Sequence, residues 1–384
     1  MPRNRDDHSN PMNGRNGYNN EMKPKKSGMN VKKVFAISFC IVLGIVCISG
    51  GVVYKLGTDL YSSINYVADE DVQVVETLPE EMMEETLSTE ERTGVAVSAD
   101  ELDSIHNLMS SLSDRETVSD DDIYNVLLVG VDRQEKTWNG NSDAMMLVSV
   151  NKKQNKVSIV SLMRDTYVDI EGVGYAKLNA AYAYGAGPLL CQTVTDTYKV
   201  KVDRYAAVDF WALVDIIDII GGVSLQITAK EAEVANGYIR DMCERQLNID
   251  PSGHYLPSEG GLVYCDGVQA VAYARNRYVG NSDFQRTERQ RYVIQQLMEE
   301  VKQMSIAQMT EKMQAILEHV TMNIPETEIW SMLGEVPDIL EYEFEMSRVP
   351  YDNMYSTIYV KGQDMLVPDW DATIEKLHNT IYGE

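Results

Sequence analysis

Short apolar runs bounded by glycine or polar residues begin abruptly at Tyr124. Asn125–Gly130 reads NVLLVG, which is typical of a strand that is buried on both faces. Met145–Val150 and Val157–Leu162 are two further apolar runs, and the polar turn Asn151–Lys156 separates them. Two strands joined by such a turn predict a hairpin with a medium-length loop.

Longer apolar segments predict helices after this hairpin. Ala206–Ile220 is apolar on most faces and is followed by two glycines, as expected for a buried helix with a glycine at its C-terminus. Val223–Ile227 predicts another strand, and Ser282–Met304 predicts a long helix with Ser282 or Asp283 capping its first amides. Strands and helices thus alternate, which predicts an α/β domain with helices on both faces of a mixed central sheet.

An uncharged apolar segment runs from Val34 to Tyr54, between Lys33 and Lys55. About 20 such residues span a hydrocarbon core roughly 30 Å thick. A cleaved signal peptide is the alternative, but the stretch is longer than a typical signal-peptide core and no clear cleavage site follows it. Lysines precede the segment and acidic residues follow it. The positive-inside rule therefore predicts a single-pass protein of the cell membrane, with a cytoplasmic N-terminus and an extracytoplasmic domain.

Composition divides the rest of the chain into a tail, a stalk and a domain. Residues 1–33 carry eight basic and three acidic side chains with little apolar content, which predicts a disordered cytoplasmic tail. Residues 57–122 carry nineteen acidic and two basic side chains, so 55–122 is interpreted as an acidic extracytoplasmic stalk. Within it, Ala99–Leu112 has the pattern of a short amphipathic helix. The globular domain is predicted over 123–384.

Charge and cysteine usage narrow the possible functions. The formal net charge is −25 and the globular segment is itself acidic, which argues against general nucleic-acid binding because that requires a basic surface. Cys40 and Cys47 lie in the apolar segment, and the other cysteines have no metal-ligand spacing. Cys191 has no evident partner, whereas Cys243 and Cys265 are compatible either with a disulfide or with two unrelated thiols.

Polar clusters lie at the ends of three predicted strands, where sites in α/β folds gather. Asp132 follows the first strand, Asp143 precedes the second and Arg164 follows the third. If Val150 pairs with Val157 in the hairpin, the residue opposite Asp143 is Arg164. A register slip of one or two residues would still leave both at the same end of the sheet.

Two interpretations of these residues remain open. Asp132 and Asp143 can approach one another near Arg164, and carboxylates gathered in this way commonly hold Mg²⁺, which takes oxygen ligands and bridges substrate phosphates. Alternatively, each aspartate caps a turn and Arg164 makes an ordinary ion pair. Spacing alone does not distinguish a metal site from these local structural roles.

A second polar cluster contains five arginines and no lysine between Arg275 and Arg291. The guanidinium fork suits bidentate binding of phosphate or carboxylate better than lysine does. Arg286 and Arg289 are three residues apart and share a face of the predicted helix, whose N-terminus itself favours an anion. The alternative is a solvated helix face that pairs with carboxylates, and it suits Arg291, which points away from that face. We favour phosphate binding for the other four, including Arg277.

One further motif, KLNAAYAYG at Lys177–Gly185, has two interpretations. It predicts either a helix whose tyrosines pack on the sheet, or an anion contact from Lys177 or Asn179. The five histidines have no zinc-site spacing, and the chain contains no P-loop, no dinucleotide-binding fingerprint and no Gly-x-Ser-x-Gly nucleophile motif.

In this order, the motifs resemble those of the LytR-CpsA-Psr family of cell-wall glycopolymer transferases. The resemblance runs from about Tyr124 to the C-terminus, and the membrane topology matches as well. The matching blocks are NVLLVGVD, NSDAMML, MRDTYVDI, KLNAAYAYG, VDIIDIIGGV and YARNR followed by SDFQRTERQ. The resemblance implies a three-layer α/β/α sandwich with a central mixed sheet, plus one N-terminal transmembrane helix. It also implies a hydrophobic tunnel for a polyprenyl chain, with a pyrophosphate at its mouth.

The resemblance implies roles for individual residues. Asp132 and Asp143 would hold Mg²⁺ (or Mn²⁺) and, with Arg164, form the catalytic centre. The residues implied to contact or orient the pyrophosphate are Arg164, Arg275, Arg277, Arg286, Arg289, Gln290 and Lys177. The chain departs from the family pattern at Asn141, where the family often has an arginine, so one possible phosphate contact is missing. Two smaller departures are Met163 in place of proline and Gln285 in place of glycine.

The implied activity is phosphoryl transfer on the outer face of the membrane of a Gram-positive cell. A hydroxyl of peptidoglycan, the implied acceptor, would attack the phosphorus that carries a glycopolymer, such as teichoic acid or capsule, and polyprenyl phosphate would leave. One alternative is a polyprenyl-pyrophosphate hydrolase, in which water replaces the wall hydroxyl. The other is a non-catalytic module that senses the lipid carrier or a glycan. The set Asp132, Asp143 and Arg164 favours chemistry over pure binding.

Overall fold

The computed structural model describes part of the chain. The described residues are 64–78, 92–133, 138–279, 282–304, 308, 312, 315–339 and 342–383. The predicted membrane segment at 34–54 and the predicted tail lie outside them. Within the described ranges, no helix is both long enough and apolar enough to cross a membrane.

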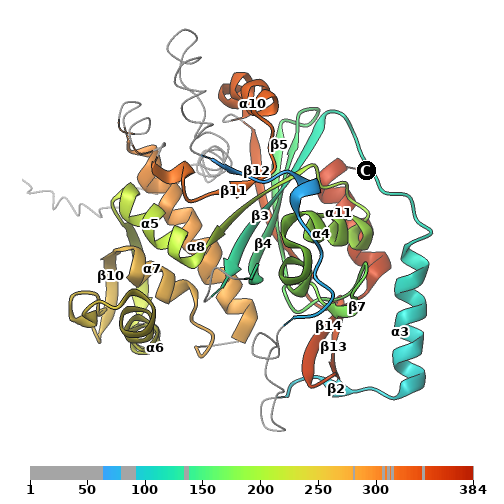
Figure 1. The fold of residues 1–384 in the computed structure, drawn as a ribbon, viewed down its shortest axis with the longest axis horizontal. Coiled ribbons are helices and arrows are strands. Elements are labelled where there is room, and N and C mark those ends of the chain that lie inside the picture. The colour runs from blue at the N-terminus through green and yellow to red at the C-terminus, as the bar shows by residue number, and fades with distance from the viewer. Residues whose placement is uncertain are drawn as a thin grey trace, which may run out of the picture. The chain divides into compact units, whose positions relative to one another are not determined.

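A seven-stranded mixed sheet forms the centre of the fold (Figure 1). Neighbours β3–β4, β4–β5 and β8–β11 are antiparallel, whereas β3–β8, β5–β12 and β1–β11 are parallel. The predicted central mixed sheet is therefore confirmed. In sheet order the strands are β1 (Asn65–Tyr66), β11 (Thr321–Met322), β8 (Arg204–Asp209), β3 (Ile123–Asp132), β4 (Asn141–Asn151), β5 (Lys156–Leu162) and β12 (Glu343–Val349).

The predicted hairpin is strands β4 and β5, and its register is the one expected. Val150 pairs with Val157, and the ladder continues as far as the Met146–Ser161 pair. The short polar turn at 152–155 specifies this register, because the turn type and loop length fix the pairing of the two strands of a hairpin. Strand β4 also pairs with β3. The end of β3, the start of β4 and the end of β5, where the predicted site residues lie, are therefore adjacent in the sheet.

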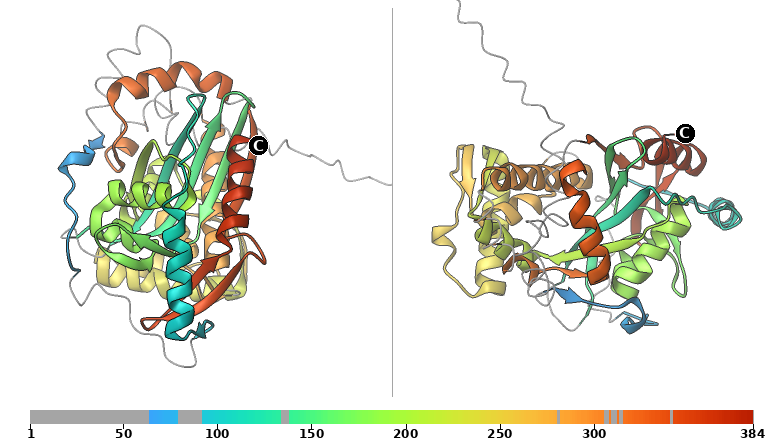
Figure 2. Two further views of the ribbon diagram at one scale, coloured as in Figure 1. Left: turned by 90° about the vertical axis from the view of Figure 1, so that its right-hand side faces the viewer. Right: turned by 90° about the horizontal axis from the view of Figure 1, so that it is seen from above.

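Helices cover both faces of the sheet and enclose two apolar cores (Figures 1 and 2). Successive residues of β3 point to opposite cores, Val126 to one and Leu127 to the other, which explains the continuous apolar run in the sequence. On the first face the helices are α5 (Phe210–Ile220), α6 (Ala229–Asp241), α7 (Gly267–Ala274), α8 (Ser282–Lys302) and α10 (Glu326–Ile339). On the second face they are α3 (Ala99–Leu112), α4 (Ala180–Tyr198) and α11 (Trp370–Tyr382).

The predicted helix at Ala206–Ile220 is wrong over its first four residues. These residues belong to β8, which pairs in parallel with β3, and helix α5 begins only at Phe210. Asp209 is the N-cap of α5, and its carboxylate accepts a hydrogen bond from the Ala212 amide. The small apolar side chains at the start of the segment fit a central strand as well as a helix, so the position beside β3 decided the outcome.

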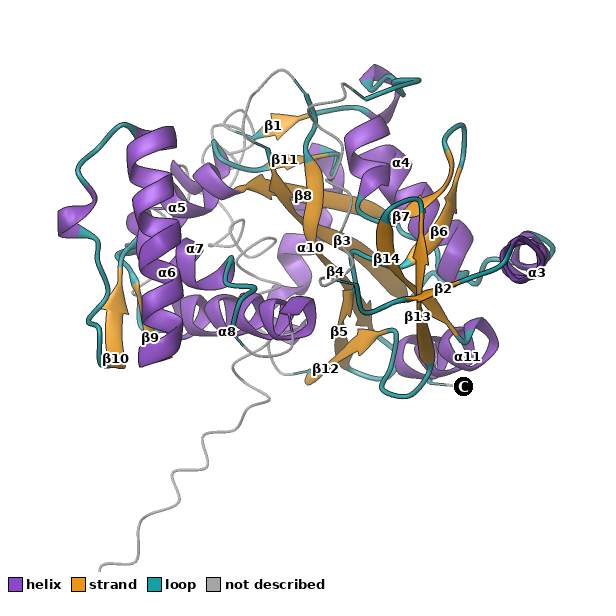
Figure 3. Ribbon diagram, turned by 90° about the horizontal axis from the view of Figure 1, so that it is seen from below, coloured by secondary structure: helices purple, strands orange, loops and turns teal. Residues whose placement is uncertain are grey.

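The predicted strand at Val223–Ile227 is confirmed as β9 (Val223–Thr228), but it lies outside the central sheet. It pairs with β10 (Gly260–Cys265) in a separate two-stranded sheet beside α6 (Figure 3). The predicted helix at Ser282–Met304 is confirmed as α8, whereas the side chains of Ser282 and Asp283 lie outside the described set, so their capping role stays a prediction.

Three small features complete the fold. The hairpin β6 (Tyr167–Ile170) and β7 (Gly174–Lys177) follows Arg164, and β13 (Tyr355–Val360) pairs with β14 (Gln363–Pro368) near the C-terminus. Short helical turns occur at Asp69–Asp71, Met242–Leu247 and Pro251–Gly253. Cys191, Cys243 and Cys265 are free thiols, so the possible Cys243–Cys265 disulfide does not form.

Part of the acidic segment 55–122 packs onto the domain. Helix α3 has the predicted bounds, Ala99–Leu112, and begins with a reciprocal capping box between Ser98 and Glu101. His106 of α3 stacks on Tyr175 with ring centroids 3.7 Å apart. Strand β2 (Val95–Ala96) pairs with β13, and β1 joins the edge of the central sheet. Packed structure in the described ranges therefore begins before residue 123.

Candidate functional site

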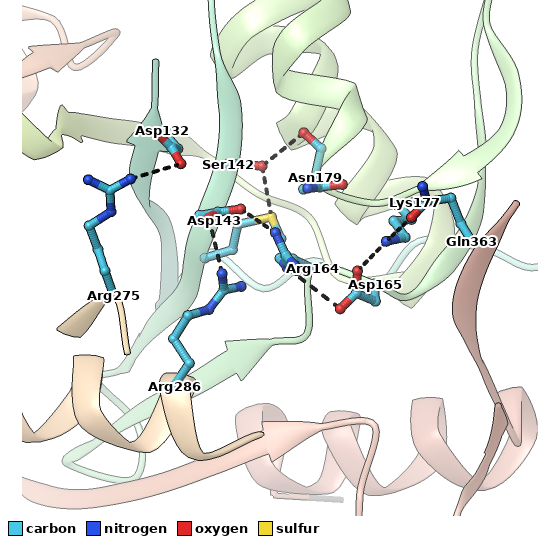
Figure 4. A network of polar contacts seen from close by, with 11 residues as sticks. Asp132, Ser142, Asp143, Arg164, Asp165, Lys177, Asn179, Arg275, Arg286 and Gln363 are labelled. Carbon is cyan, nitrogen blue, oxygen red and sulfur yellow. Dashed lines mark hydrogen bonds and ion pairs between the residues drawn. The ribbon is translucent and has the colours of Figure 1, made fainter. Parts of the chain in front are cut away.

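A β-bulge places Asp143 at the centre of the candidate site. Gly130 pairs with Ala144 and Val131 with Ser142, so Asp143 is the extra residue of β4 and has no partner on β3. Such a bulge turns a side chain out of the regular alternation of the strand. The carboxylate of Asp143 therefore points toward residues that follow β5 and residues of α8 (Figure 4).

Two buried arginines hold the Asp143 carboxylate. The Nη1 atom of Arg164 donates to Asp143 Oδ1 at 2.8 Å, and Nη1 of Arg286 donates to Asp143 Oδ2 at 3.1 Å. Burial acts to raise the pKa of Asp143, but the charges of Arg164 and Arg286 outweigh it and hold that pKa well below its usual range. The predicted approach of Asp143 and Arg164 is therefore an ion pair in the structure.

Asp132 lies at the end of β3 beside this pair and is held more loosely. Its Oδ2 atom is 4.0 Å from Nη2 of Arg275, and its side chain is 32% exposed. Burial raises the pKa of Asp132, the nearby charge of Asp143 raises it further, and Arg275 opposes the shift. The structure thus places the two predicted carboxylates close enough for their charges to act on one another, with Asp143 tightly paired and Asp132 in a longer ion pair with Arg275.

Lys177 reaches the site through a neighbouring carboxylate. Its Nζ atom is 2.8 Å from Asp165 Oδ1 and donates to Oε1 of Gln363 at 3.0 Å. The other oxygen of Asp165 is 3.5 Å from Nε of Arg164. A continuous chain of charges, Lys177–Asp165–Arg164–Asp143, therefore extends from β7 to the centre, and it orients the Arg164 guanidinium.

Arg275 and Arg277 approach the centre from the segment between α7 and α8. The guanidinium carbon of Arg275 lies 4.9 Å from the centre of the Phe210 ring. Arg277 is exposed, and its charge contributes to lowering the pKa of Asp143. Arg277 is therefore the more accessible of these two arginines to an anionic ligand.

Arg289 does not reach the aspartates, although it lies only three residues after Arg286. Its Nε atom donates to Glu231 Oε1 at 2.8 Å. Its Nη1 and Nη2 atoms donate to the carbonyl oxygens of Asn276 and Val279 at 3.0 and 2.8 Å. All three of its nitrogens thus tie α8 to α6 and to the segment that carries Arg277. Gln290 is buried on α8, one helical turn after Arg286.

Replacing Arg289 with methionine is expected to lower the free energy of unfolding by about 3 kcal/mol, because a largely buried carboxylate loses its partner. Arg291→Met is the matched control on the same helix. Its guanidinium donates to the Ser161 hydroxyl, and loss of that bond is expected to cost about 1 kcal/mol. Denaturant unfolding measures both. Wild-type stability combined with lost phosphate binding in Arg289→Met would instead mean that Arg289 contacts the ligand.

Two contributors to the site were missed from the sequence. Asp165 directly follows Arg164 in the block MRDTYVDI, and that adjacency is the sequence signal for its contact with Arg164. Glu231 forms a capping box with Thr228, and that local pattern predicts a helix start rather than an ion pair with Arg289. No sequence signal connects Glu231 with a residue 58 positions later.

The two aspartates fit only one kind of metal site. Within the described ranges, no group of three or more histidine, cysteine, aspartate or glutamate side chains is placed to hold a metal ion. Mg²⁺ is commonly held by one or two carboxylates, with water and substrate phosphates completing its coordination. Asp132 and Asp143 fit that arrangement, because their charges act on one another and the Asp132 carboxylate, whose ion pair with Arg275 is as long as 4.0 Å, is held less tightly than that of Asp143.

A separate cleft lies at the other end of β3, and its residues are not those of the aspartate centre. Its lining includes Tyr124, Arg204 and Glu328. Arg204 Nε donates to Glu328 Oε2 at 2.9 Å, and the Tyr124 hydroxyl donates to the same oxygen at 3.0 Å. Arg204 and Glu328 thus neutralise one another within the protein. Less of their charge is available to bind an ion in this cleft than at the aspartate centre.

Comparison with known proteins places the chain among proteins of one family and one fold. Biofilm regulatory protein A of Streptococcus mutans is 32% identical over 248 residues, which is 60% of this chain and 56% of that protein. The polyisoprenyl-teichoic acid–peptidoglycan teichoic acid transferase TagU of Enterococcus faecalis is 29% identical over 242 residues, 62% of this chain and 72% of that protein. The solved structure of TagT bound to LIIa-WTA has the same fold, with a TM-score of 0.53 and 24% identity over 70% of this chain and 95% of that one.

The model of the LytR_cpsA_psr family matches residues 82–379 in one continuous stretch. That stretch contains every strand and arginine of the aspartate centre. The chain therefore belongs to the LytR_cpsA_psr family.

Proposed function

We propose that this protein is a membrane-anchored, Mg²⁺-dependent phosphotransferase that moves a glycopolymer from a polyprenyl-pyrophosphate carrier to peptidoglycan on the outer face of the membrane. The observation that carries the proposal is Asp143 held between Arg164 and Arg286, with Asp132 beside it. Support also comes from the E. faecalis relative, which is named as a transferase of teichoic acid to peptidoglycan. The apolar segment before Lys55 is the proposed anchor, with the N-terminus in the cytoplasm.

The proposed chemistry is an in-line displacement at phosphorus. A hydroxyl oxygen of peptidoglycan forms a bond to the phosphorus that bears the glycopolymer and loses its proton. The bond from that phosphorus to the bridging oxygen breaks, and polyprenyl phosphate leaves. Arg275 and Arg277 contact the incoming pyrophosphate. Arg164 and Arg286, which both reach Asp143 in Figure 4, stabilise negative charge beside it. Fixed positive charge where anionic charge develops is usually the largest catalytic contribution.

Asp132 and Asp143 would hold the metal, which when bound would neutralise part of the pyrophosphate charge. Arg164 stays oriented throughout, because Asp165 and Asp143 contact it from two sides. The proposed tunnel for the polyprenyl chain would deliver the lipid to this centre.

The test uses the full chain in detergent with Mg²⁺, a synthetic polyprenyl-pyrophosphate-linked sugar and peptidoglycan fragments. Release of polyprenyl phosphate and the mass gained by peptidoglycan are followed together. Metal-dependent modification of peptidoglycan supports the transferase. Lipid release without that modification would indicate the hydrolase, and tight lipid binding without turnover would indicate the sensor.

Asp132→Asn is expected to reduce transfer at least about 10²-fold, because the more open of the two metal carboxylates is lost. The same variant is expected to lose the rise in melting temperature that Mg²⁺ produces in the wild type through binding to the folded state. The control is Asp203→Asn at the opposite end of the sheet, where the carboxylate pairs with Lys201. An Mg²⁺-induced rise that persists in Asp132→Asn would contradict the proposed metal site.

A further inference from the structure

An exposed tyrosine lies next to the arginines of the site. Tyr278 directly follows Arg277 in the segment between α7 and α8, and it is 72% exposed. Its ring stacks on that of Tyr238 from α6, with centroids 6.4 Å apart and planes 21° apart. Tyr238 thus packs against one side of Tyr278. We call this pair of rings the aromatic shelf.

The backbone on both sides of Tyr278 is held in place. Asn276 is fully buried, and its Oδ1 atom accepts a hydrogen bond from the Tyr278 amide at 3.2 Å. Arg289 donates to the carbonyl oxygens of Asn276 and Val279, one on each side of Tyr278. An exposed aromatic residue on a fixed backbone loses little conformational freedom when it binds a ligand, because only two side-chain torsions remain to be ordered.

The aromatic shelf is continuous with the aspartate centre. The guanidinium carbon of Arg275 lies 5.6 Å from the centre of the Tyr238 ring, and Nη2 of the same residue is 4.0 Å from Asp132. Arg277 directly precedes Tyr278, and its charge opposes the rise in the pKa of Tyr238 and contributes to the low pKa of Asp143. A group linked directly to a bound phosphate would therefore extend from Arg275 toward Tyr238 and Tyr278.

We propose that the aromatic shelf binds the pyranose ring attached to the transferred phosphate, that is, the first sugar of the carrier-linked glycan. A pyranose ring has an apolar C–H face that packs on an aromatic ring and a polar edge that suits the neighbouring arginine donors. A polyprenyl chain has no polar edge and suits an enclosed apolar surface instead. This inference rests on the proposed function, because the position of the phosphate follows from it.

The test measures binding rather than turnover, using the full chain in detergent and two probes. One probe is polyprenyl pyrophosphate, and the other is the same lipid carrying one N-acetylglucosamine. Tyr278→Ala is expected to weaken binding of the sugar-bearing probe about tenfold and to leave binding of the bare lipid unchanged. Tyr278→Phe keeps the ring and is expected to restore the affinity.

Tyr264→Ala is the matched control, because Tyr264 is also exposed, at 59%, but lies on β10, which pairs with β9 and carries none of the arginines of the site. An equal loss of affinity for both probes in Tyr278→Ala, or no loss for either, would overturn the proposal that the aromatic shelf binds the sugar. If both probes bind Tyr278→Ala normally and the separate transfer assay shows a higher KM for peptidoglycan, the ring belongs to the acceptor site and the inference is also overturned. If the wild type binds neither probe, the proposed function itself fails, so the two failures are distinguishable.

Discussion

Arg286→Ala is expected to lower the rate of glycopolymer transfer about 10²- to 10³-fold, the usual effect of removing one fixed donor from the charge-stabilising part of an active site. Arg286 is 3% exposed and contacts Asp143 through Nη1. Its removal leaves Arg164 as the remaining direct partner of that carboxylate among the contacts described above. Single-turnover release of polyprenyl phosphate measures the effect on the chemical step.

Arg291→Ala is the matched control for this experiment. Arg291 lies on the same helix α8 and is also partly buried, but it donates to the Ser161 hydroxyl rather than to an aspartate. Transfer in this variant is expected to stay within about threefold of the wild type after correction for the folded fraction. Equal losses in Arg286→Ala and Arg291→Ala would show that helix α8 acts through general stability, and that Arg286 has no special part in transfer.

Asp143→Asn is expected to lower the free energy of unfolding by about 3–5 kcal/mol when the metal is removed with a chelator. The substitution leaves two guanidinium groups, Arg164 and Arg286, buried at 9% and 3% exposure without the carboxylate that lies between them. Urea unfolding at pH 7 measures the loss. Asp371→Asn is the control, since its carboxylate is 72% exposed in a surface pair with Arg115, and such pairs contribute little.

The same pair makes stability depend on pH in a defined direction. The Arg164 and Arg286 charges, acting against burial, hold the pKa of Asp143 below its value in the unfolded chain, which is about 3.9. The folded state therefore binds this proton less readily, and the stabilisation is present above about pH 4 and lost as the pH falls further. Asp143→Asn should flatten that acid-side fall, and an unchanged fall in the variant would mean that other carboxylates cause it.

Basic residues of the site that look alike in the sequence have different partners in the structure. Arg164 and Arg286 bind the central carboxylate, whereas Arg289 fixes the segment that carries Arg277. Lys177 does not contact Asp143 directly but pairs with Asp165, which in turn contacts Arg164. A substitution in any of these residues would reduce activity, so the readouts that separate them are stability, metal binding and affinity for the lipid probes.

Local patterns determined much of the fold and one central contact of the site. The short turn between β4 and β5 specifies the pairing of Val150 with Val157. That pairing brings the segment after β5 toward the start of β4, where Arg164 forms the ion pair with Asp143. The amphipathic pattern and the capping box at Ser98 likewise determine α3, because both depend only on neighbours within a helical turn. The ordered motifs also identify the family.

The tertiary structure alone decided which distant partner each charged residue has. A spacing of three residues predicts a shared helix face for Arg286 and Arg289, yet one contacts Asp143 and the other Glu231. Their partners come from β4 and α6, and the packing of α8 between those elements sets which partner lies within reach. The segment at Ala206 is a strand rather than a helix for the same reason, since hydrogen bonds to β3 outweigh a weak local preference. Short-range patterns carry no information about such long-range contacts.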